Sequence, residues 1–279
     1  MKYEDQLRKR LEEVGLSLDI YKTLPPKYIR LNPRKNVTQK DIETELGVKL
    51  TPVTGLHDVF MCSKPLVGTE ASDKGIYYVQ DLSSMIPILA LEVRKKDSLL
   101  DLCAAPGTKS ALAYDMVDGD LKLTCIDISS KRYTRMLKYF HTHGVMAETF
   151  HKDGRRFKSE PFDRVLVDAP CSGEGIITRY KDVLEESTFR VKRRAKLQLV
   201  LLKKGFELLK PGGLLVYFTC TLNKYENEKV LSKFLSKQKD ATLYLPKIKL
   251  DVKLKQSEFG IRIIPGKTRG GFVSRIKKE

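Results

Sequence analysis

Two cysteines stand in short motifs whose residue types suit nucleophilic chemistry. Cys171 lies in the run Asp168-Ala-Pro-Cys171-Ser-Gly, and Cys220 lies in the run Phe-Thr-Cys220-Thr. A cysteine thiolate attacks electron-poor carbon and can form a covalent intermediate. Asp168 adds a carboxyl group that could act as an acid if its surroundings raise its pKa. The motifs therefore predict covalent catalysis, and their spacing alone does not decide which cysteine attacks.

The remaining cysteines do not suggest a metal site or a disulfide framework. The chain has five cysteines, at positions 62, 103, 125, 171 and 220, and no two form a Cys-x-x-Cys pair. Zinc sites and disulfide-rich domains normally show paired spacing. We therefore expect no bound metal, and we expect Cys62 and Cys125 to be inert side chains of the core.

A run of small residues, Asp101-Leu-Cys-Ala-Ala-Pro-Gly-Thr-Lys-Ser110, follows a predicted strand. Small residues at a strand-to-helix turn let the backbone approach a nucleotide-like ligand. The run lacks the glycine pattern of a phosphate loop and the Gly-x-Gly-x-x-Gly of dehydrogenases. It therefore predicts a cofactor without a pyrophosphate, held by Cys103, Ala104, Ala105, Pro106, Gly107, Thr108 and Lys109.

Two carboxylates follow the next two predicted strands. Asp127 ends the second strand, 20 residues after Gly107, where a carboxylate can accept hydrogen bonds from ribose hydroxyls. Asp153 follows the third strand and is placed to contact an adenine edge. Either residue alone is equally well explained as a helix cap or a solvated turn, but together they favour an adenosyl cofactor. Lys109 also has two interpretations of equal weight, a cation that lowers a thiolate pKa and a solvated surface group.

A parallel sheet is needed to bring these motifs together. From residue 98 onward, short apolar runs alternate with helical patterns, which is typical of a doubly wound α/β sheet with helices on both faces. The carboxyl ends of parallel strands share one edge, so the two cysteines and the cofactor loop are expected to meet there. The end of the chain predicts an antiparallel edge hairpin joined through Pro265-Gly266. The expected strands are 98–102, 121–127, 145–150, 164–168, 214–219, 258–264 and 271–276, and the expected helices are 108–117, 130–143, 182–209 and 224–237.

The pattern changes near residue 75, and the preceding residues predict smaller units. Leu7, Leu11 and Val14 form one stripe of a helix over 3–14. The Pro25-Pro26 pair separates this helix from a small α+β module. In that module we expect strands at 28–31, 48–53 and 59–62 and a helix at 39–46 capped by Thr38. The chain thus divides into an N-terminal helix (1–19), a small module (20–72) and a catalytic domain (73–279).

The charge of the chain predicts a polyanionic partner. Lys and Arg number 52 against 35 Asp and Glu, which gives a formal net charge of +17 and a pI near 9.5. Such an excess is typical of proteins that bind nucleic acid, although a Lys-rich surface without a partner is the alternative. No apolar run approaches the roughly 20 residues of a membrane span, and the first residues lack the order of a signal peptide. We expect a cytoplasmic protein that does not bind membranes.

Taken together, these residues resemble the RNA 5-methylcytosine methyltransferase family, which includes the bacterial Sun/Fmu enzymes and the eukaryotic NOL1/NOP2/Sun-domain proteins. The resemblance covers roughly residues 28–276. It rests on Tyr78-Val-Gln-Asp-Leu-Ser-Ser84, the 101–109 run, Asp127, Asp153, the two cysteine motifs and Gly271-Phe272. It implies a Rossmann-like class I methyltransferase sheet, S-adenosylmethionine as the cofactor and RNA as the partner.

The resemblance also implies roles for single residues. In this family the Thr-Cys cysteine is the nucleophile and the Pro-Cys cysteine assists product release, so Cys220 would attack and Cys171 would assist. Asp168 and Lys109 complete the expected catalytic set. The cofactor site would contain residues 103–109 with Asp127, Arg132, Asp153 and Asp168. Two departures are visible: Thr221 stands where many members have serine, and Pro265-Gly266 stands where many have Pro-His.

The small module is expected to hold RNA with help from the catalytic face, because Arg30-Leu31-Asn32 is similar to the start of the family's RNA-binding module. Lys and Arg side chains would bind phosphates and make binding sensitive to salt. The basic groups available for this are Lys27, Arg30, Arg34, Lys35, Arg190, Lys192, Arg193, Arg194, Lys196, Arg262, Lys267 and Arg269.

The leading hypothesis is a monomeric cytosine-5 RNA methyltransferase. A tRNA substrate is favoured over rRNA because the chain resembles minimal archaeal tRNA members of the family. One alternative is an RNA-binding assembly factor without catalysis. A DNA cytosine methyltransferase is a further alternative, but it would attack with Cys171 and carry a Glu-Asn-Val motif that this sequence lacks.

Overall fold

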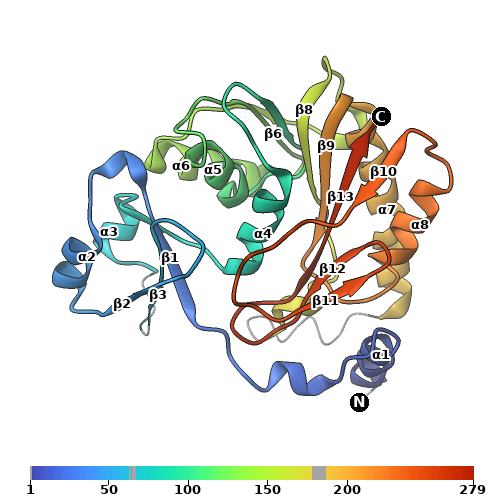
Figure 1. Ribbon diagram of the computed structural model, residues 1–279, viewed down its shortest axis with the longest axis horizontal. Coiled ribbons are helices and arrows are strands. Elements are labelled where there is room, and N and C mark those ends of the chain that lie inside the picture. Colours follow the sequence, from blue (N-terminus) through green and yellow to red (C-terminus); the bar gives the residue numbers. More distant parts are fainter. Residues whose placement is uncertain (1, 63, 65–66, 178–186) are drawn as a thin grey trace.

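The computed structural model describes residues 2–62, 64, 67–177 and 187–279. In this part of the chain, two β-sheets lie side by side, a small one near the N-terminus and a larger one that carries the predicted motifs (Figure 1). None of the described helices combines the length and the hydropathy that a membrane span requires.

The large sheet has the strand order β11-β12-β13-β9-β8-β5-β6-β7, and β10 pairs with β13. The five consecutive strands from β9 to the edge strand β7 are parallel. These are β5 (Ser98–Asp101), β6 (Lys122–Asp127), β7 (Glu148–His151), β8 (Phe162–Asp168) and β9 (Leu209–Thr219). The predicted doubly wound sheet is confirmed, and each predicted parallel strand is present.

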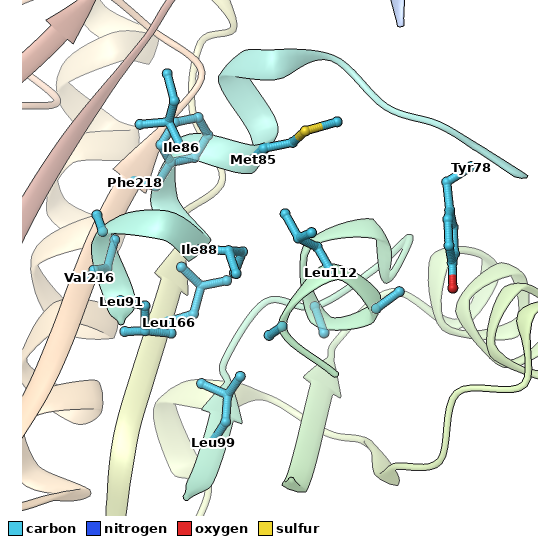
Figure 2. Close-up of a cluster of buried hydrophobic side chains, with 14 of the residues drawn as sticks. Tyr78, Met85, Ile86, Ile88, Leu91, Leu99, Leu112, Leu166, Val216 and Phe218 are labelled. Atoms are coloured by element: carbon cyan, nitrogen blue, oxygen red, sulfur yellow. The ribbon is translucent and has the colours of Figure 1, made fainter. Parts of the chain in front are cut away.

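Helices cover both faces of this sheet because alternate strand residues are apolar on opposite sides. Leu99 packs with the helices of one face, and the next residue, Leu100, packs with those of the other. Figure 2 shows the first of these cores, where Ile88 and Leu91 lie near Leu166. The covering helices are α4 (Leu82–Leu91), α5 (Thr108–Asp115), α6 (Ser130–His143), α7 (Thr188–Glu207) and α8 (Glu228–Leu235).

Three of these helices differ from the prediction. Helix α8 begins at Glu228 and not at residue 224. Helix α4 was not among the expected helices, and Pro87 inside it lacks the backbone N–H of a normal helical residue. Asp81 caps this helix by accepting a hydrogen bond from the Ser83 N–H, and nearly every side chain of the helix is buried. Helix α7 begins at Thr188, and the part of the expected helix over 182–186 lies outside the described residues.

The C-terminal segment forms the antiparallel edge that the sequence predicts. Strand β13 (Gly271–Lys278) pairs with β9, and β12 (Gly260–Ile263) returns to it through the Pro265-Gly266 turn. Strands β11 (Leu254–Ser257) and β10 (Ala241–Tyr244) extend this edge beyond the prediction.

The small sheet is antiparallel, with the order β2-β3-β1-β4. Its strands are β1 (Lys27–Leu31), β2 (Leu50–Pro52), β3 (Val59–Cys62) and β4 (Tyr77–Val79), and α2 (Gln39–Leu46) and α3 (Glu70–Asp73) accompany them. The predicted cap of α2 is present, since the Thr38 hydroxyl accepts from the Asp41 N–H at 3.3 Å. Strand β4 lies beyond residue 72, so the small sheet extends past the boundary that the sequence suggested.

The N-terminal helix α1 (Lys2–Glu12) packs on the large domain, far from the small sheet that follows it in sequence (Figure 1). Leu7 and Leu11 are buried against Ile177 and Leu222. The apolar stripe predicted for this helix is therefore its packing face, although Val14 lies beyond its end. The short 3-10 helices are η1 (Leu18–Tyr21), η2 (Pro33–Lys35), η3 (Gly154–Arg156) and η4 (Glu174–Ile176).

Candidate active site at the carboxyl edge of the parallel sheet

The two motif cysteines meet at the carboxyl ends of β8 and β9. These strands are parallel neighbours, and Asp168 pairs with Phe218 in the ladder, so the loops that follow them emerge side by side. The sulfur atoms of Cys171 and Cys220 lie 2.8 Å apart, and the Cys220 backbone N–H donates to the Cys171 sulfur at 3.2 Å. Both side chains are partly exposed, as a reactive thiol requires.

The Cys171 thiol lies in surroundings that disfavour its thiolate. Its hydrogen bond with Cys220, together with burial, raises the pKa of the Cys171 thiol well above its ordinary value. Cys171 therefore keeps its proton at neutral pH. Either sulfur of the pair could be the donor at 2.8 Å, so the geometry allows a protonated Cys171 to donate to Cys220.

Lys109 faces the site and is not a solvated surface group. Its ammonium lies 2.7 Å from Asp168 Oδ2, and the two side chains are 13% and 25% exposed. Burial alone would lower the pKa of Lys109, but the charge and hydrogen bond of Asp168 outweigh burial and raise it. The charge of Cys220 contributes in the same direction. Lys109 thus keeps its positive charge within this ion pair.

The predicted cofactor loop lies beside this pair, between β5 and α5. It folds back on itself, because the Gly107 N–H donates to the Ala104 carbonyl at 2.7 Å and the Ala104 N–H donates to the Ile126 carbonyl at 2.8 Å. Gly107 has a φ of 98°, and a Cβ there would lie 2.6 Å from a ring carbon of Phe140. Only glycine fits this turn without displacing the helix packed beneath it.

Asp127 supports this loop from the end of β6. It accepts hydrogen bonds from the backbone N–H groups of Ala105 at 3.2 Å and Ser129 at 2.9 Å. Arg132 lies 3.4 Å from Asp127 and also donates to the Ala105 carbonyl. Asp127, which the sequence predicted to contact a ribose, therefore fixes the conformation of the loop.

Asp153 follows β7, which is the parallel neighbour of β6. It caps η3 and forms a bidentate contact with Arg155, so the helix-cap interpretation of this residue is realised. The turn packs closely on the cofactor loop, because a Cβ on Gly154 would lie 2.9 Å from the Leu102 carbonyl. Acceptor oxygens at two neighbouring strand ends, beside a loop of small residues, suit the hydroxyl and amino donors of an adenosine. The residues present fit an adenosyl cofactor.

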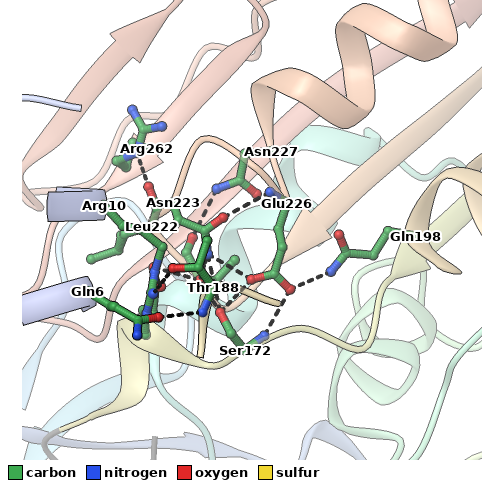
Figure 3. Close-up of polar contacts among 12 residues, drawn as sticks. Gln6, Arg10, Ser172, Thr188, Gln198, Leu222, Asn223, Glu226, Asn227 and Arg262 are labelled. Carbon is green, nitrogen blue, oxygen red and sulfur yellow. Dashed lines mark hydrogen bonds and ion pairs between the residues drawn. The ribbon is translucent and has the colours of Figure 1, made fainter. Parts of the chain in front are cut away.

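A buried polar network that the sequence did not predict lies behind the cysteine loop (Figure 3). The Glu226 side chain accepts from the Ser172 N–H at 3.0 Å, from Asn223 at 2.7 Å and from Gln198 at 2.8 Å. Burial raises the pKa of this carboxyl group. Since Ser172 follows Cys171, the network fixes the cysteine loop from behind. The available signal was the cluster of amides and carboxylates over 223–228, just after the Cys220 motif.

Two of the basic residues expected to be available for RNA are not. Arg30 is 4% exposed and forms an ion pair with Asp115, which also binds Arg34. Arg262 is buried and bound to the Leu222 carbonyl and to Glu228. A guanidinium that is desolvated against a carboxylate cannot also contact a phosphate. Exposed cations remain on α7, namely Arg190, Lys192, Arg193 and Lys196.

Comparisons with known proteins agree with this geometry. A family model described as 16S rRNA methyltransferase RsmB/F matches residues 88–277. A probable ribosomal RNA small subunit methyltransferase B from Bacillus subtilis is 32% identical over 228 residues, which are 77% of this chain and 50% of the relative. A ribosomal RNA small subunit methyltransferase F from Aeromonas salmonicida is 37% identical over 188 residues, covering 64% of this chain and 40% of the relative. The chain spans about half the length of these curated relatives.

Solved structures match nearly the whole chain. A methyltransferase homolog from Pyrococcus horikoshii superposes with a TM-score of 0.78 at 26% identity, covering 98% of this chain and 99% of the other. NSun6 from Pyrococcus horikoshii, solved with the S-adenosylmethionine analogue SFG, gives a TM-score of 0.87 at 20% identity, covering 100% and 98%. The second similarity is evidence for the fold alone.

Proposed function

Because this chain belongs to the RsmB/F (Sun/Fmu) family of S-adenosylmethionine-dependent RNA methyltransferases, we propose that it methylates carbon 5 of cytosine in RNA through a covalent Cys220 adduct. The observation that carries this proposal is the contact between Cys171 and Cys220 beside the Lys109–Asp168 pair. A lone thiol would serve many reactions, but two thiols with an acid pair suit addition to a pyrimidine ring followed by elimination.

In the first step, the Cys220 thiolate forms a bond to carbon 6 of cytosine. The electron pair of the 5,6 double bond forms a 4,5 double bond, the pair of the 3,4 double bond moves to ring nitrogen 3, and that nitrogen takes a proton. Asp168 is the group proposed to contact that nitrogen, and its ion pair with Lys109 is the source of the proton. Carbon 5 is then an enamine carbon and is nucleophilic.

The cofactor is proposed to lie on the 103–109 loop, with Asp127, Arg132 and Asp153 around its adenosyl part. S-adenosylmethionine supplies an electrophilic methyl group when it is bound. Asp127 and Arg132 hold the loop in the shape that the cofactor meets.

Once carbon 5 carries the methyl group, ring nitrogen 3 returns its proton to the Asp168–Lys109 pair, and the 3,4 double bond is restored. In the last step, a base removes the proton from carbon 5. That electron pair restores the 5,6 double bond, and the Cys220 sulfur leaves as a thiolate. We assign Cys171 to assist this release, because its sulfur lies next to the bond that breaks.

We propose tRNA as the substrate, on the resemblance to minimal tRNA members of the family. The second candidate is rRNA, which is favoured by the names of the curated relatives from Bacillus subtilis and Aeromonas salmonicida.

The test is methyl transfer from S-adenosylmethionine labelled in the methyl group to separate pools of tRNA, rRNA and DNA, followed by nucleoside analysis. We expect labelled 5-methylcytidine in the tRNA pool. Label in rRNA only would shift the assignment to the second candidate, and label in DNA only would reject an RNA substrate. Binding of RNA without any transfer would point to an assembly factor.

A further inference from the structure

We propose that Arg10 of α1 and Glu174 are positioning residues for the nucleophile, so that the N-terminal helix is a functional part of the active site. This inference rests on the proposed function. It concerns a helix that lies outside the residues matched by the family model.

The first observation is a buried ion pair between distant parts of the chain. Arg10 Nε lies 2.7 Å from Glu174 Oε1, and the side chains are 3% and 0% exposed. The two residues are 164 positions apart in the sequence. A carboxylate with no exposed surface needs such a partner, because an unpaired charge in the interior is strongly unfavourable. Arg10 is thus the group that allows a charged Glu174 at this place.

The second observation links Glu174 to the nucleophile. Its other oxygen, Oε2, accepts a hydrogen bond from the Thr221 hydroxyl at 3.0 Å, and Thr221 follows Cys220 directly. The Gly175 N–H donates to the Cys220 carbonyl at 2.9 Å. Residues 174 and 175 therefore contact the Cys220 carbonyl and the side chain of the next residue, Thr221.

The third observation joins this contact to the other cysteine loop. The Thr221 hydroxyl oxygen lies 2.8 Å from the Ser172 hydroxyl oxygen, and Ser172 follows Cys171. The series of contacts from Arg10 through Glu174 to Thr221 thus ends where the two cysteine loops touch. A displacement of Glu174 would alter the 2.8 Å separation of the two sulfurs.

Helix α1 is held firmly in the orientation that this role needs. Gln6 Oε1 accepts from the Thr188 N–H at 2.8 Å, and Arg10 donates to the Thr188 hydroxyl at 3.2 Å (Figure 3). Leu7 and Leu11 pack against Leu222, which follows Thr221 in the sequence. Because the Arg10 side chain is buried, it cannot bind an RNA phosphate, so its effect on the nucleophile must pass through the side chains that it contacts, Glu174 among them.

The test follows covalent attack on RNA that carries 5-fluorocytidine, with S-adenosylmethionine present. Fluorine at carbon 5 cannot leave as a proton does, so the Cys220 adduct persists and can be counted on a denaturing gel. The rate of adduct formation reports the placement of the thiolate, and the final amount reports the fraction of correctly folded protein. The variants are Arg10→Met, Arg10→Lys, Glu174→Gln and the double variant Arg10→Met/Glu174→Gln. Arg8→Met is the matched control, because Arg8 lies on the same helix, is half exposed and pairs only with Glu4 among the contacts described.

We expect Arg10→Met to slow adduct formation by about 100-fold, because a small misplacement of a reacting group has an effect of that size. The final amount of adduct and the KM for RNA should stay within about twofold of the wild type, since no RNA contact is removed. Arg10→Lys should recover part of the rate. The double variant should be no slower than Arg10→Met, because the two residues act as one unit.

Three results would overturn the inference. The first is an Arg10→Met rate equal to that of the Arg8→Met control. The second is a loss of adduct amount at an unchanged rate, which would mean that α1 only stabilises the fold. The third is a raised KM with a weaker salt dependence of binding, which would mean that Arg10 binds RNA. If the wild type itself forms no adduct and transfers no methyl group, the proposed function fails, which is a different outcome from any of these.

Discussion

At the scale of single residues, the central question is which of two adjacent thiols attacks. The sequence placed both at one edge of a sheet, and the family resemblance assigned the attack to Cys220. The structure adds a physical argument, since the pKa of Cys171 is raised and its thiol lies within hydrogen-bonding distance of the Cys220 sulfur. A protonated neighbour stabilises a thiolate in the same way as any hydrogen-bond donor.

The two cysteines should therefore respond differently to replacement. Cys220→Ala should lower methyl transfer by about 1000-fold or more, because no covalent route remains. Cys171→Ala should leave an RNA adduct that survives denaturation, because release is impaired. Labelled methyl transfer and denaturing electrophoresis measure the two effects. Cys62→Ala is the control, because Cys62 is buried in the small sheet. An adduct with Cys220→Ala in place of Cys171→Ala would reverse the assignment.

At the scale of secondary-structure elements, Arg30 and Arg34 join the small sheet to the catalytic domain. Both pair with Asp115 at the end of α5, and the Arg30 guanidinium lies 3.8 Å from the centre of the Tyr78 ring. Arg34 also donates to the carbonyl of His143, at the end of α6, at 3.0 Å. The motif that resembled the start of an RNA-binding module thus fixes that module against the catalytic domain.

Asp115→Ala should consequently destabilise the protein. It leaves the buried Arg30 charge without its carboxylate, and the loss of one partner of a buried pair lowers the free energy of unfolding by about 3–5 kcal/mol. Urea unfolding monitored by circular dichroism gives this value. Asp118→Ala is the control, because Asp118 is 78% exposed and its pair with Lys95 is worth at most about 1 kcal/mol. Equal, small effects of the two replacements would show that the Asp115 contacts do not hold the domains together.

At the scale of the whole molecule, the formal charge of +17 raises the question of which cations are exposed and where they lie. Arg30 and Arg262 are internal, so they contribute to packing and not to a binding surface. The exposed Arg190 and Arg193 lie in the first turns of α7, next to Thr188, which contacts α1 behind the active site. This surface is the one that we expect RNA phosphates to contact.

RNA binding should therefore weaken with salt, and α7 should account for part of that dependence. Arg190→Ala and Arg193→Ala should each reduce the magnitude of the slope of log affinity against log salt by about 1, which is the value expected for the loss of one phosphate contact. Filter binding or fluorescence anisotropy at several salt concentrations measures the slope. Lys95→Ala is the control, because Lys95 precedes β5 at the opposite edge of the sheet and its charge is exposed. A slope that changes equally in all three variants would exclude α7 as a specific RNA contact.

The sequence by itself determined the parallel sheet and the place of its reactive groups. Apolar runs of strand length alternate with amphipathic helices, and this periodicity depends only on neighbouring residues. Once the strands are parallel, Asp168, Cys171 and Cys220 must follow adjacent carboxyl ends. The proximity of the thiols was therefore predictable, as was the glycine turn of the cofactor loop.

Only the tertiary structure decided which charged groups are paired and which are free. Lys109 turned out to face Asp168, Arg30 to be internal, and Arg10 to reach Glu174 across 164 residues. Helix α4, with its internal proline, forms because packing on the sheet compensates for the lost hydrogen bond. These ion pairs and this helix depend on long-range packing and desolvation, which the local periodicity of a sequence does not indicate.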